Sequence, residues 1–416
     1  MPDAAAGRYT YATHLECSLT AERYDIGTLQ GLSAAGKPLL ARYDLAALRA
    51  ARSRADIEAR PPGLWRWREL LPVPDAAHVV SLGEVETPLV PLIRSERPAG
   101  FAAPLVKDEG RLPTGSFKAR GLCIALCMAH AHGVRRVAIP TNGNAGAAMA
   151  AYAARAGIES FCFCPEDTPE VNVREIAAQG AAVWKVNGLI HDCARLVQQG
   201  AKEFGWFDMS TLREPYRIEG KKTMGLELAI QFGWRLPEVV FYPTGGGTGI
   251  IGMWKGWQEL IELGWLSGPL PRLVAVQSSG CAPIVRAFDE GATHARAWDN
   301  AHTIAWGIRV PSALGDFLIL RALRDSGGFA IAVDDAAILE GRAHVGARDG
   351  LLLSPEGAAT YAAYRQAAAA GRIRADERAV LFNCASGLKY DMPDAAGFMD
   401  VKRPLDTAAI RRRLVS

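Results

Sequence analysis

Segments with the pattern of strands alternate with segments that have the pattern of helices along most of this chain. Residues 134–139 carry the β-branched side chains of a strand, and the alanine-rich residues 144–156 that follow are typical of a helix. The alternation continues through strands at 160–164, 182–186, 239–242, 272–277, 328–333 and 379–383, and through helices at 170–179, 192–204, 223–232, 249–263, 283–290, 335–348 and 355–370. This spacing predicts βαβ units, and therefore an α/β fold with mostly parallel sheets and helices on both faces.

The chain has 416 residues, which is enough for one large domain or two medium ones. It contains no internal repeat and no low-complexity hinge, since the alanine run at 367–370 continues a predicted helix. Any two domains must therefore share strands or exchange segments. Residues 1–75 precede the alternating region, and within them we expect a short strand at 39–43 and a helix at 45–60 that a Pro-Pro-Gly run ends.

The composition limits the kinds of partner that this chain can have. Hydrophobic residues make up 49% of it and charged residues 22%, as in ordinary globular proteins. The formal net charge of +3 is too small to imply a polyanionic partner. The short basic run at 411–413 is interpreted as a solvated end rather than as a contact for nucleic acid. We expect no nucleic-acid partner.

The cysteines and the apolar segments indicate a cytoplasmic protein without a membrane span. None of the eight cysteines forms a CxxC pair. Five of them lie in apolar segments and are expected to be reduced, buried thiols: Cys123, Cys127, Cys162, Cys164 and Cys193. Residues 1–8 lack the basic and apolar regions of a signal peptide. No stretch of about 18 residues is continuously apolar and uncharged, so we expect no transmembrane helix.

Lys118 lies in the sequence TGSFKARG, between a predicted strand at 104–107 and an apolar helix at 122–131. Thr114 or Ser116 can cap the start of that helix. Because the positive end of a helix disfavours a cation, this position lowers the pKa of the lysine amine, and a neutral amine is what Schiff-base chemistry requires. The alternative is a surface lysine whose charged end reaches water.

Two turns between a strand and a helix are candidate anion sites. Residues 141–146, TNGNAG, combine backbone N–H groups with small side chains, which suits a carboxylate, and Asn144 adds a side-chain donor. The same residues are equally consistent with a plain turn and a helix cap. In residues 243–249, PTGGGTG, three consecutive glycines let the backbone approach an anion, most often a phosphate. The spacing is neither GxGxxG nor GxxxxGK[ST].

A further segment, residues 382–389 with the sequence FNCASGLK, follows the last predicted strand. Its small polar side chains can present a hydroxyl or a thiol to a ring nitrogen. Taken alone, it is equally an ordinary loop.

Together and in this order, these four segments resemble the fold-type II family of pyridoxal phosphate (PLP) enzymes, which includes threonine synthase, serine and threonine dehydratases and tryptophan synthase β. The similarity is closest to threonine synthase-like enzymes. It extends from about Leu82 to Lys389 and includes residues 214–223, EPYRIEGKKT. The resemblance implies two three-layer α/β domains with PLP in the cleft between them. The implied parts are an N-terminal arm at 1–75 (a degenerate zinc-ribbon-like segment plus a helix), a large PLP-binding domain at 76–117 and 205–400, a small α/β domain at 118–204 and a C-terminal tail at 401–416.

The resemblance also implies a role for each matching residue. Lys118 would hold the cofactor as a Schiff base and would then carry protons. Asn144 would bind the ring hydroxyl of the cofactor. Cys384, where threonine synthases usually carry Thr, would face the pyridine nitrogen, with Ser386 as the alternative contact, and a neutral group there suits elimination and replacement. The implied phosphate cup consists of Gly245, Gly246, Gly247, Thr248 and Gly249, and the implied loop for the substrate carboxylate consists of Thr141, Asn142 and Gly143.

The residues that would bind a substrate phosphate match the family only in part. Arg217 and Lys222 would hold the leaving phosphate, although Lys222 is equally a solvated residue at a helix start. The Asn-Ser pair that many family members carry just upstream falls on Thr211 and Leu212. A nearby Asn falls on Glu214, which would repel an anion if it pointed inward.

The N-terminal arm departs from the family pattern as well. Residues 38–44 keep the stretch that follows a zinc-ribbon-like segment in related enzymes, but Cys17 is the one remaining thiol of that segment. Four-coordinate zinc needs more ligands, so we expect an arm without metal.

The leading hypothesis is a PLP-dependent lyase that converts O-phosphohomoserine and water to threonine and phosphate, as threonine synthases do. The alternative is an ammonia-lyase or dehydratase acting on serine, threonine or another β-substituted amino acid, which the missing phosphate donors favour. The intact Lys118 and glycine turn disfavour a third reading, a non-catalytic protein that binds PLP or a partner. The resemblance alone implies a homodimer. Trp254, Trp257 and Trp265 are expected in the core rather than at an interface.

Overall fold

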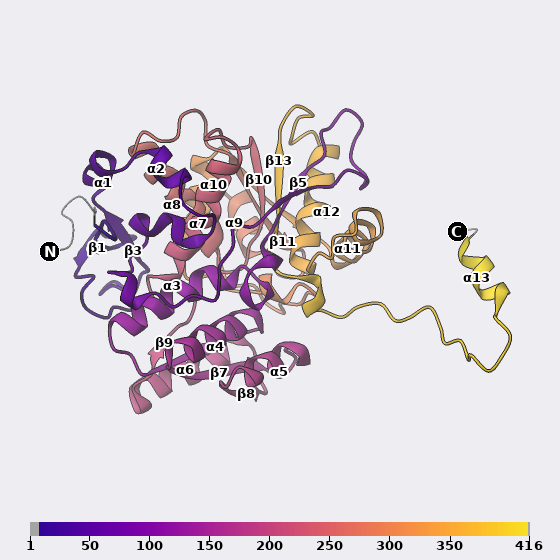
Figure 1. Cartoon of the computed structure of the whole chain (residues 1–416), viewed down its shortest axis with the longest axis horizontal. Helices are drawn as coiled ribbons and strands as arrows, with labels where there is room; N and C mark the ends of the chain where they lie inside the picture. The colour runs from indigo at the N-terminus through magenta and orange to yellow at the C-terminus, as the bar shows by residue number, and fades with distance from the viewer. Residues whose placement is uncertain (1–7, 415–416) are drawn as a thin grey trace.

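The computed structural model describes residues 8–414, and its strands form three sheets (Figure 1). The expectation that the chain starts without a signal peptide concerns residues 1–8. Of these, residues 1–7 lie outside the described range. No helix between residues 8 and 414 is long and apolar enough to cross a membrane. All eight cysteines are buried and free of disulfides, as the sequence predicts for the five in apolar segments.

The largest sheet has six strands in the order β12-β11-β10-β13-β5-β4. Neighbouring strands are parallel except β4 and β5, which pair antiparallel. The mostly parallel sheet that the alternating pattern predicts is therefore confirmed, and β4 is a strand that the pattern does not reveal. The strands are β4 (Leu89–Pro91), β5 (Leu105–Asp108), β10 (Val239–Pro243), β11 (Arg272–Ser278), β12 (Phe329–Val333) and β13 (Ala379–Asn383).

Helices cover both faces of this sheet and make it the middle of three layers. Alternate side chains of β10 point to opposite faces, so that Val240 and Tyr242 pack in one core while Val239 and Phe241 pack in the other. The first face is covered by α7 (Arg217–Gln231), α8 (Thr248–Glu262), α9 (Pro283–Asp289) and α10 (Asp316–Asp325), and the second by α11 (Asp335–Asp349) and α12 (Pro355–Ala369). The short helix α10 has no counterpart in the pattern read from the sequence.

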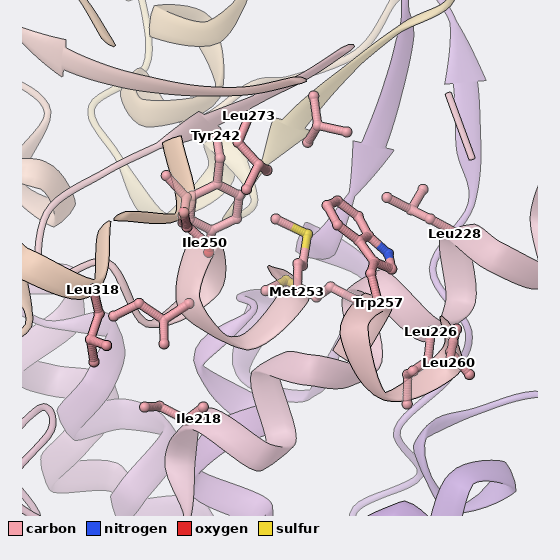
Figure 2. Packing of buried hydrophobic residues seen from close by; sticks show 14 of the residues in the cluster. Ile218, Leu226, Leu228, Tyr242, Ile250, Met253, Trp257, Leu260, Leu273 and Leu318 are labelled. Atoms are coloured by element: carbon pink, nitrogen blue, oxygen red, sulfur yellow. The ribbon is translucent and has the colours of Figure 1, made fainter. Parts of the chain in front are cut away.

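The core on the first face is built around α8. Figure 2 shows Met253 and Trp257 of α8 lying beside Leu226 and Leu228 of α7. The contact between α7 and α8 is close because Gly225 accepts a hydrogen bond from the Trp257 indole at 3.0 Å through its carbonyl. The expectation that the three tryptophans near α8 belong to the core is confirmed, since Trp257 and Trp265 are buried and Trp254 packs against the same cluster.

A second, smaller sheet has four parallel strands in the order β8-β7-β6-β9. On one face Val137 and Cys162 pack against helices that include α3 and α4, and on the other Ala138 and Phe161 pack against α6. The strands are β6 (Arg136–Pro140), β7 (Glu159–Pro165), β8 (Ala182–Val186) and β9 (Phe207–Asp208). The helices are α3 (Lys118–Ala131), α4 (Asn144–Ala156), α5 (Glu170–Ala178) and α6 (Ile190–Phe204).

The N-terminal residues form a three-stranded antiparallel sheet of β1 (Ala12–Cys17), β2 (Arg23–Tyr24) and β3 (Leu39–Tyr43). Only β3 follows from the sequence pattern. The single helix predicted at 45–60 is wrong, because the chain forms α1 (Leu45–Ala51) and α2 (Arg54–Glu58) instead. Ser53 breaks the run by capping α2 in a capping box with Asp56.

This arm is docked against the rest of the protein. Leu15 of β1 packs in the core of the small sheet, whereas Leu40 of β3 packs in the core of the large sheet. The hydroxyl of Tyr43 donates a hydrogen bond to Glu219 of α7 at 2.8 Å. The arm therefore joins the two cores.

The C-terminal segment leaves the body after η6 (Gly387–Lys389) and ends in α13 (Thr407–Leu414), away from the sheets (Figure 1). Arg411 is exposed, in line with a solvated end. The side chains of Arg412 and Arg413 lie outside the described part of the chain.

Candidate active site

One cavity of about 450 Å³ brings together loops from the two larger sheets. It lies at the carboxyl ends of β6, β10 and β13, where ligand sites of parallel α/β sheets form. Every site residue predicted from the sequence lines this cavity except Lys222. The residues concerned are Lys118, Thr141, Asn142, Gly143, Asn144, Arg217, Gly245, Gly246, Gly247, Thr248, Gly249 and Cys384.

Lys118 is half-buried and is the first residue of α3. Burial, together with the positive charge of Arg217, lowers the pKa of the Lys118 amine to about 8. The interpretation as a surface lysine is therefore wrong. The predicted caps are wrong as well, because α3 has no side-chain cap among the described residues: Thr114 and Ser116 both precede its N-cap, Phe117.

The start of α3 is held by a buried network of charges that the sequence analysis missed. Arg120 donates to Glu109 at 2.6 Å and to Glu227 at 2.5 Å, and Lys107 donates to Glu227 at 2.7 Å. All four side chains are excluded from solvent. Since Arg120 is two residues from Lys118, the network ties the lysine to β5 and α7.

The glycine turn between β10 and α8 has the backbone of an anion site. Gly247, the N-cap of α8, has φ +79°, and no side chain caps this helix among the described residues. A Cβ on Gly247 would lie 2.1 Å from Ile319, and one on Gly249 would lie 2.1 Å from Tyr242. Only glycine fits there, and the first N–H groups of α8 remain available to a phosphate.

The turn between β6 and α4 is shaped by its own side chains. The hydroxyl of Thr141 accepts hydrogen bonds from the backbone N–H groups of Gly143 at 3.0 Å and Gly146 at 2.9 Å. Gly143 has φ +120°, and a Cβ there would lie 2.7 Å from Asn172. Asn142 donates to the carbonyl of Trp306 at 3.3 Å, while its Oδ1 is buried without a partner in the described chain. That acceptor can take a hydrogen bond from a donor group of a ligand.

Cys384 follows β13 and is buried in the wall of the cavity. Burial, together with the charge of Glu109, raises the pKa of its thiol, so the group is a neutral thiol at physiological pH. The alternative contact, Ser386, is wrong: its hydroxyl accepts from the backbone N–H of Leu388 at 3.3 Å, and it does not line the cavity.

Arg217 lies inside the cavity wall at the start of α7, six residues before the helix start predicted from the sequence. The helix begins earlier because Glu214 accepts hydrogen bonds from the backbone N–H groups of Tyr216 at 2.8 Å and Arg217 at 3.0 Å. Burial, opposed by Arg217, raises the pKa of Glu214 to about 8. Of the two upstream residues, Thr211 lines the cavity, while Leu212 packs in the core of the large sheet.

The prediction that Lys222 holds a substrate phosphate is wrong. Its ammonium group is fully buried and lies 2.7 Å from Glu219 and 2.8 Å from Glu259, next to Lys255. The step of five positions from Arg217 to Lys222 corresponds to a rotation of about 140° around a helix, so the two side chains leave α7 on different sides. Lys222 belongs to a buried cluster between α7, α8 and the arm.

Two further cavity residues escaped the sequence analysis. Glu356 at the start of α12 and Tyr390 after η6 are buried and hydrogen-bonded to each other at 2.7 Å, and Tyr390 also contacts Asn144 at 3.1 Å. They are more than 200 residues from Asn144 in the chain, so no local pattern points to their meeting there.

Comparison with known proteins agrees with this geometry. Residues 80–385 match the family model described as pyridoxal-phosphate dependent enzyme. The chain is 33% identical to a threonine synthase of Methanocaldococcus jannaschii over 91% of this chain and 93% of that one, and 32% identical to a threonine synthase of Mycobacterium tuberculosis over 84% and 94%.

Solved structures share the fold. A diaminopropionate ammonia lyase of Escherichia coli superposes with a TM-score of 0.61 at 19% identity, over 74% of this chain and 86% of that one. A serine racemase of maize superposes with a TM-score of 0.59 at 19% identity, over 79% and 92%. The fold expected from the sequence is confirmed, and the chain belongs to the family of pyridoxal-phosphate dependent enzymes.

Proposed function

We propose that this protein is a threonine synthase, a PLP-dependent lyase that converts O-phosphohomoserine and water to threonine and phosphate. Its relatives named threonine synthase support this proposal, because their similarity spans most of both chains. The single observation that carries it is the presence of Lys118, the glycine turn and Arg217 around one cavity.

The residues of the cavity fit PLP. Lys118 provides an amine with a lowered pKa for the aldehyde, and the turn at 245–249 provides backbone N–H groups for the phosphate. Asn144, which lines the cavity, would bind the ring hydroxyl through its side-chain amide. Cys384 would face the ring nitrogen as a neutral thiol. When bound, PLP supplies an electron sink for the carbanion at the substrate α-carbon.

The side chains of the cavity then have separate tasks. Lys118, whose pKa of about 8 leaves a large share of the amine neutral near that pH, takes the α-proton of the substrate and returns protons at later steps. The turn at 141–143 binds the substrate carboxylate through its N–H groups. Arg217 binds the phosphate that leaves from the γ-carbon, with Thr211 and Ser210 beside it in the cavity wall. Water enters at the β-carbon.

A second candidate, an ammonia-lyase or dehydratase acting on a β-substituted amino acid, is favoured by one observation. Glu214 lies 3.9 Å from Arg217 and, once it ionises near pH 8, offsets the positive charge that a substrate phosphate would need. An amino acid without a phosphate needs no such charge.

Product analysis separates the two candidates. Purified protein loaded with PLP is incubated with O-phosphohomoserine, and phosphate and threonine are measured together. Equal amounts of the two products support the proposal, and the Lys118→Ala variant should release neither. Formation of oxo-acid and ammonia from serine or threonine, with no phosphate released from O-phosphohomoserine, would support the alternative.

We also propose a homodimer in the cytoplasm, with a large domain at 76–117 and 205–400, a small domain at 118–204, an arm at 1–75 and a tail at 401–416. Three strands of the four-stranded sheet fall inside 118–204, and β9 directly follows it, which supports this division. Light scattering coupled to gel filtration tests the dimer, since a mass near 45 kDa would correspond to a monomer of 44.7 kDa.

A further inference from the structure

Three side chains of the cavity wall, together with one backbone N–H group, form an unbroken chain of hydrogen bonds that the proposed reaction does not yet use. The backbone N–H of Gly307 donates to Oε1 of Glu356 at 2.6 Å. The hydroxyl of Tyr390 bonds Oε2 of Glu356 at 2.7 Å, and Nδ2 of Asn144 bonds the Tyr390 oxygen at 3.1 Å. Glu356, Tyr390 and Asn144 all line the cavity that contains Lys118.

The carboxylate sets the direction of this chain. Glu356 is an acceptor at both oxygens, so the Tyr390 hydroxyl must donate its one proton to Glu356. The Tyr390 oxygen can then only accept, and the group that faces it must be a donor. Asn144 therefore turns its nitrogen, and not its oxygen, toward Tyr390. With the opposite orientation of the amide, two acceptor oxygens would face each other.

The orientation of the amide leaves one hydrogen free. The Asn144 nitrogen carries two hydrogens, of which Tyr390 takes one, and the second remains for a ligand in the cavity. The ring oxygen of PLP is the acceptor that the proposed site places beside Asn144. Fixing the amide beforehand avoids the loss of side-chain freedom when the cofactor binds.

We propose that Glu356 and Tyr390 are positioning residues for the cofactor, which act through Asn144 by holding its amide with one N–H directed at the ring oxygen. This inference rests on the proposed PLP site. Glu356 belongs to α12 and Tyr390 to the segment after η6, and neither of these contains the cofactor lysine or the glycine turn.

The test uses cofactor binding rather than turnover. The full-length protein without PLP is titrated with PLP, and the dissociation constant and the absorption maximum of the bound cofactor are recorded for four variants. Tyr390→Phe removes the hydroxyl oxygen that links Glu356 to Asn144. In Glu356→Gln the side-chain oxygen still accepts from Gly307, but the new amide nitrogen donates to the Tyr390 oxygen. The Tyr390 hydroxyl must then donate to Asn144, so the Asn144 amide turns its oxygen toward Tyr390. The double variant combines both changes.

The matched control is Tyr361→Phe. Tyr361 is also on α12 and also buried, and its hydroxyl donates to the Glu96 carbonyl at 2.8 Å, outside the cavity. We expect this variant to bind PLP like the unmodified protein, with the same absorption maximum.

Tyr390→Phe and Glu356→Gln should each weaken PLP binding about tenfold, the effect of one hydrogen bond to a charged group, and each should shift the absorption maximum. The double variant should be no weaker than either single one, because the two residues act as one unit. Effects that multiply in the double variant, or single variants that match the control, would overturn the inference. If the unmodified protein does not bind PLP, the proposed function fails instead.

Discussion

Nε of Arg217 lies 3.9 Å from Oε1 of Glu214, and neither atom has a hydrogen-bond partner among residues 8–414. Both side chains are almost completely buried. Arg217 donates through its Nη1 to the carbonyl of Met209 at 2.9 Å, so one end of the guanidinium is fixed and its Nε remains available. A buried acid beside a buried anion-binding arginine makes the protonation of Glu214 important for stability and for binding.

The Glu214→Gln variant should be more stable than the unmodified protein at high pH and nearly equal to it at low pH. The pKa of Glu214 is raised from 4.5 to about 8, so the folded chain keeps a proton that the unfolded chain has lost between these values. Glu214 therefore lowers the free energy of unfolding progressively from about pH 4.5 to about pH 8, with an upper bound on the order of 5 kcal/mol. Urea unfolding at pH 5 and pH 8 measures this difference, and parallel pH profiles of the two proteins would contradict the raised pKa.

The rate at which PLP links to Lys118 should rise roughly tenfold per pH unit below pH 8 and level off above it. The pKa of the Lys118 amine is lowered to about 8, mainly by burial, and only the neutral amine attacks an aldehyde. Stopped-flow absorbance of the PLP-free protein mixed with PLP follows this step. Lys118→Arg should abolish it, whereas the exposed Lys202→Arg should leave it unchanged. A rate that still rises at pH 10 would mean that the pKa of Lys118 is that of an ordinary lysine.

Two matched variants on α7 should separate binding from stability. Lys222→Met breaks the buried ion pairs with Glu219 and Glu259, and should lower the free energy of unfolding by about 3 kcal/mol. Its KM for O-phosphohomoserine should stay within about twofold, since Lys222 does not line the cavity. Arg217→Met should raise that KM at least about tenfold, because it removes a charged contact with the phosphate. An equal rise of KM in both variants would indicate that Lys222 binds the substrate after all.

Gly247→Ala should weaken PLP binding by more than about tenfold. Its φ of +79° already strains an alanine by about 1 kcal/mol, and the added Cβ would lie 2.1 Å from Ile319, so the turn must shift. Gly264→Ala is the control, since Gly264 has φ +72° but nothing within 4 Å of an added Cβ. It should lose about 1 kcal/mol of stability and bind PLP normally. Isothermal titration measures the PLP affinity and thermal unfolding measures the stability. Equal PLP affinity in both variants would mean that the turn does not bind the phosphate.

The sequence predicted the parts of the fold that depend on local patterns. The helix expected at 144–156 has those bounds in the structure, and the strands at 239–242 and 379–383 lie in the centre of the large sheet. Short strands such as β2 and β4 were missed. Two or three residues are too few to show an alternation of apolar and polar side chains, and such strands form by pairing with neighbouring strands. The helix start at Arg217 was misplaced, since the N–H groups of Tyr216 and Arg217 bond to the side chain of Glu214, in a Pro-Tyr segment that does not have the pattern of a helix start.

By itself the sequence determined the α/β architecture, through the alternation of strands and helices, and the cofactor family, through the resemblance of its motifs at strand ends to a known family. Those motifs also located twelve of the residues that line the cavity. Only the tertiary structure decided which charges face the cavity. Lys222 turns away from Arg217 because a helix rotates about 100° per residue. Glu356 is linked to Asn144 through Tyr390 because α12 packs across the sheet that carries the glycine turn. Partners separated by hundreds of residues meet through tertiary packing, which local sequence patterns do not encode.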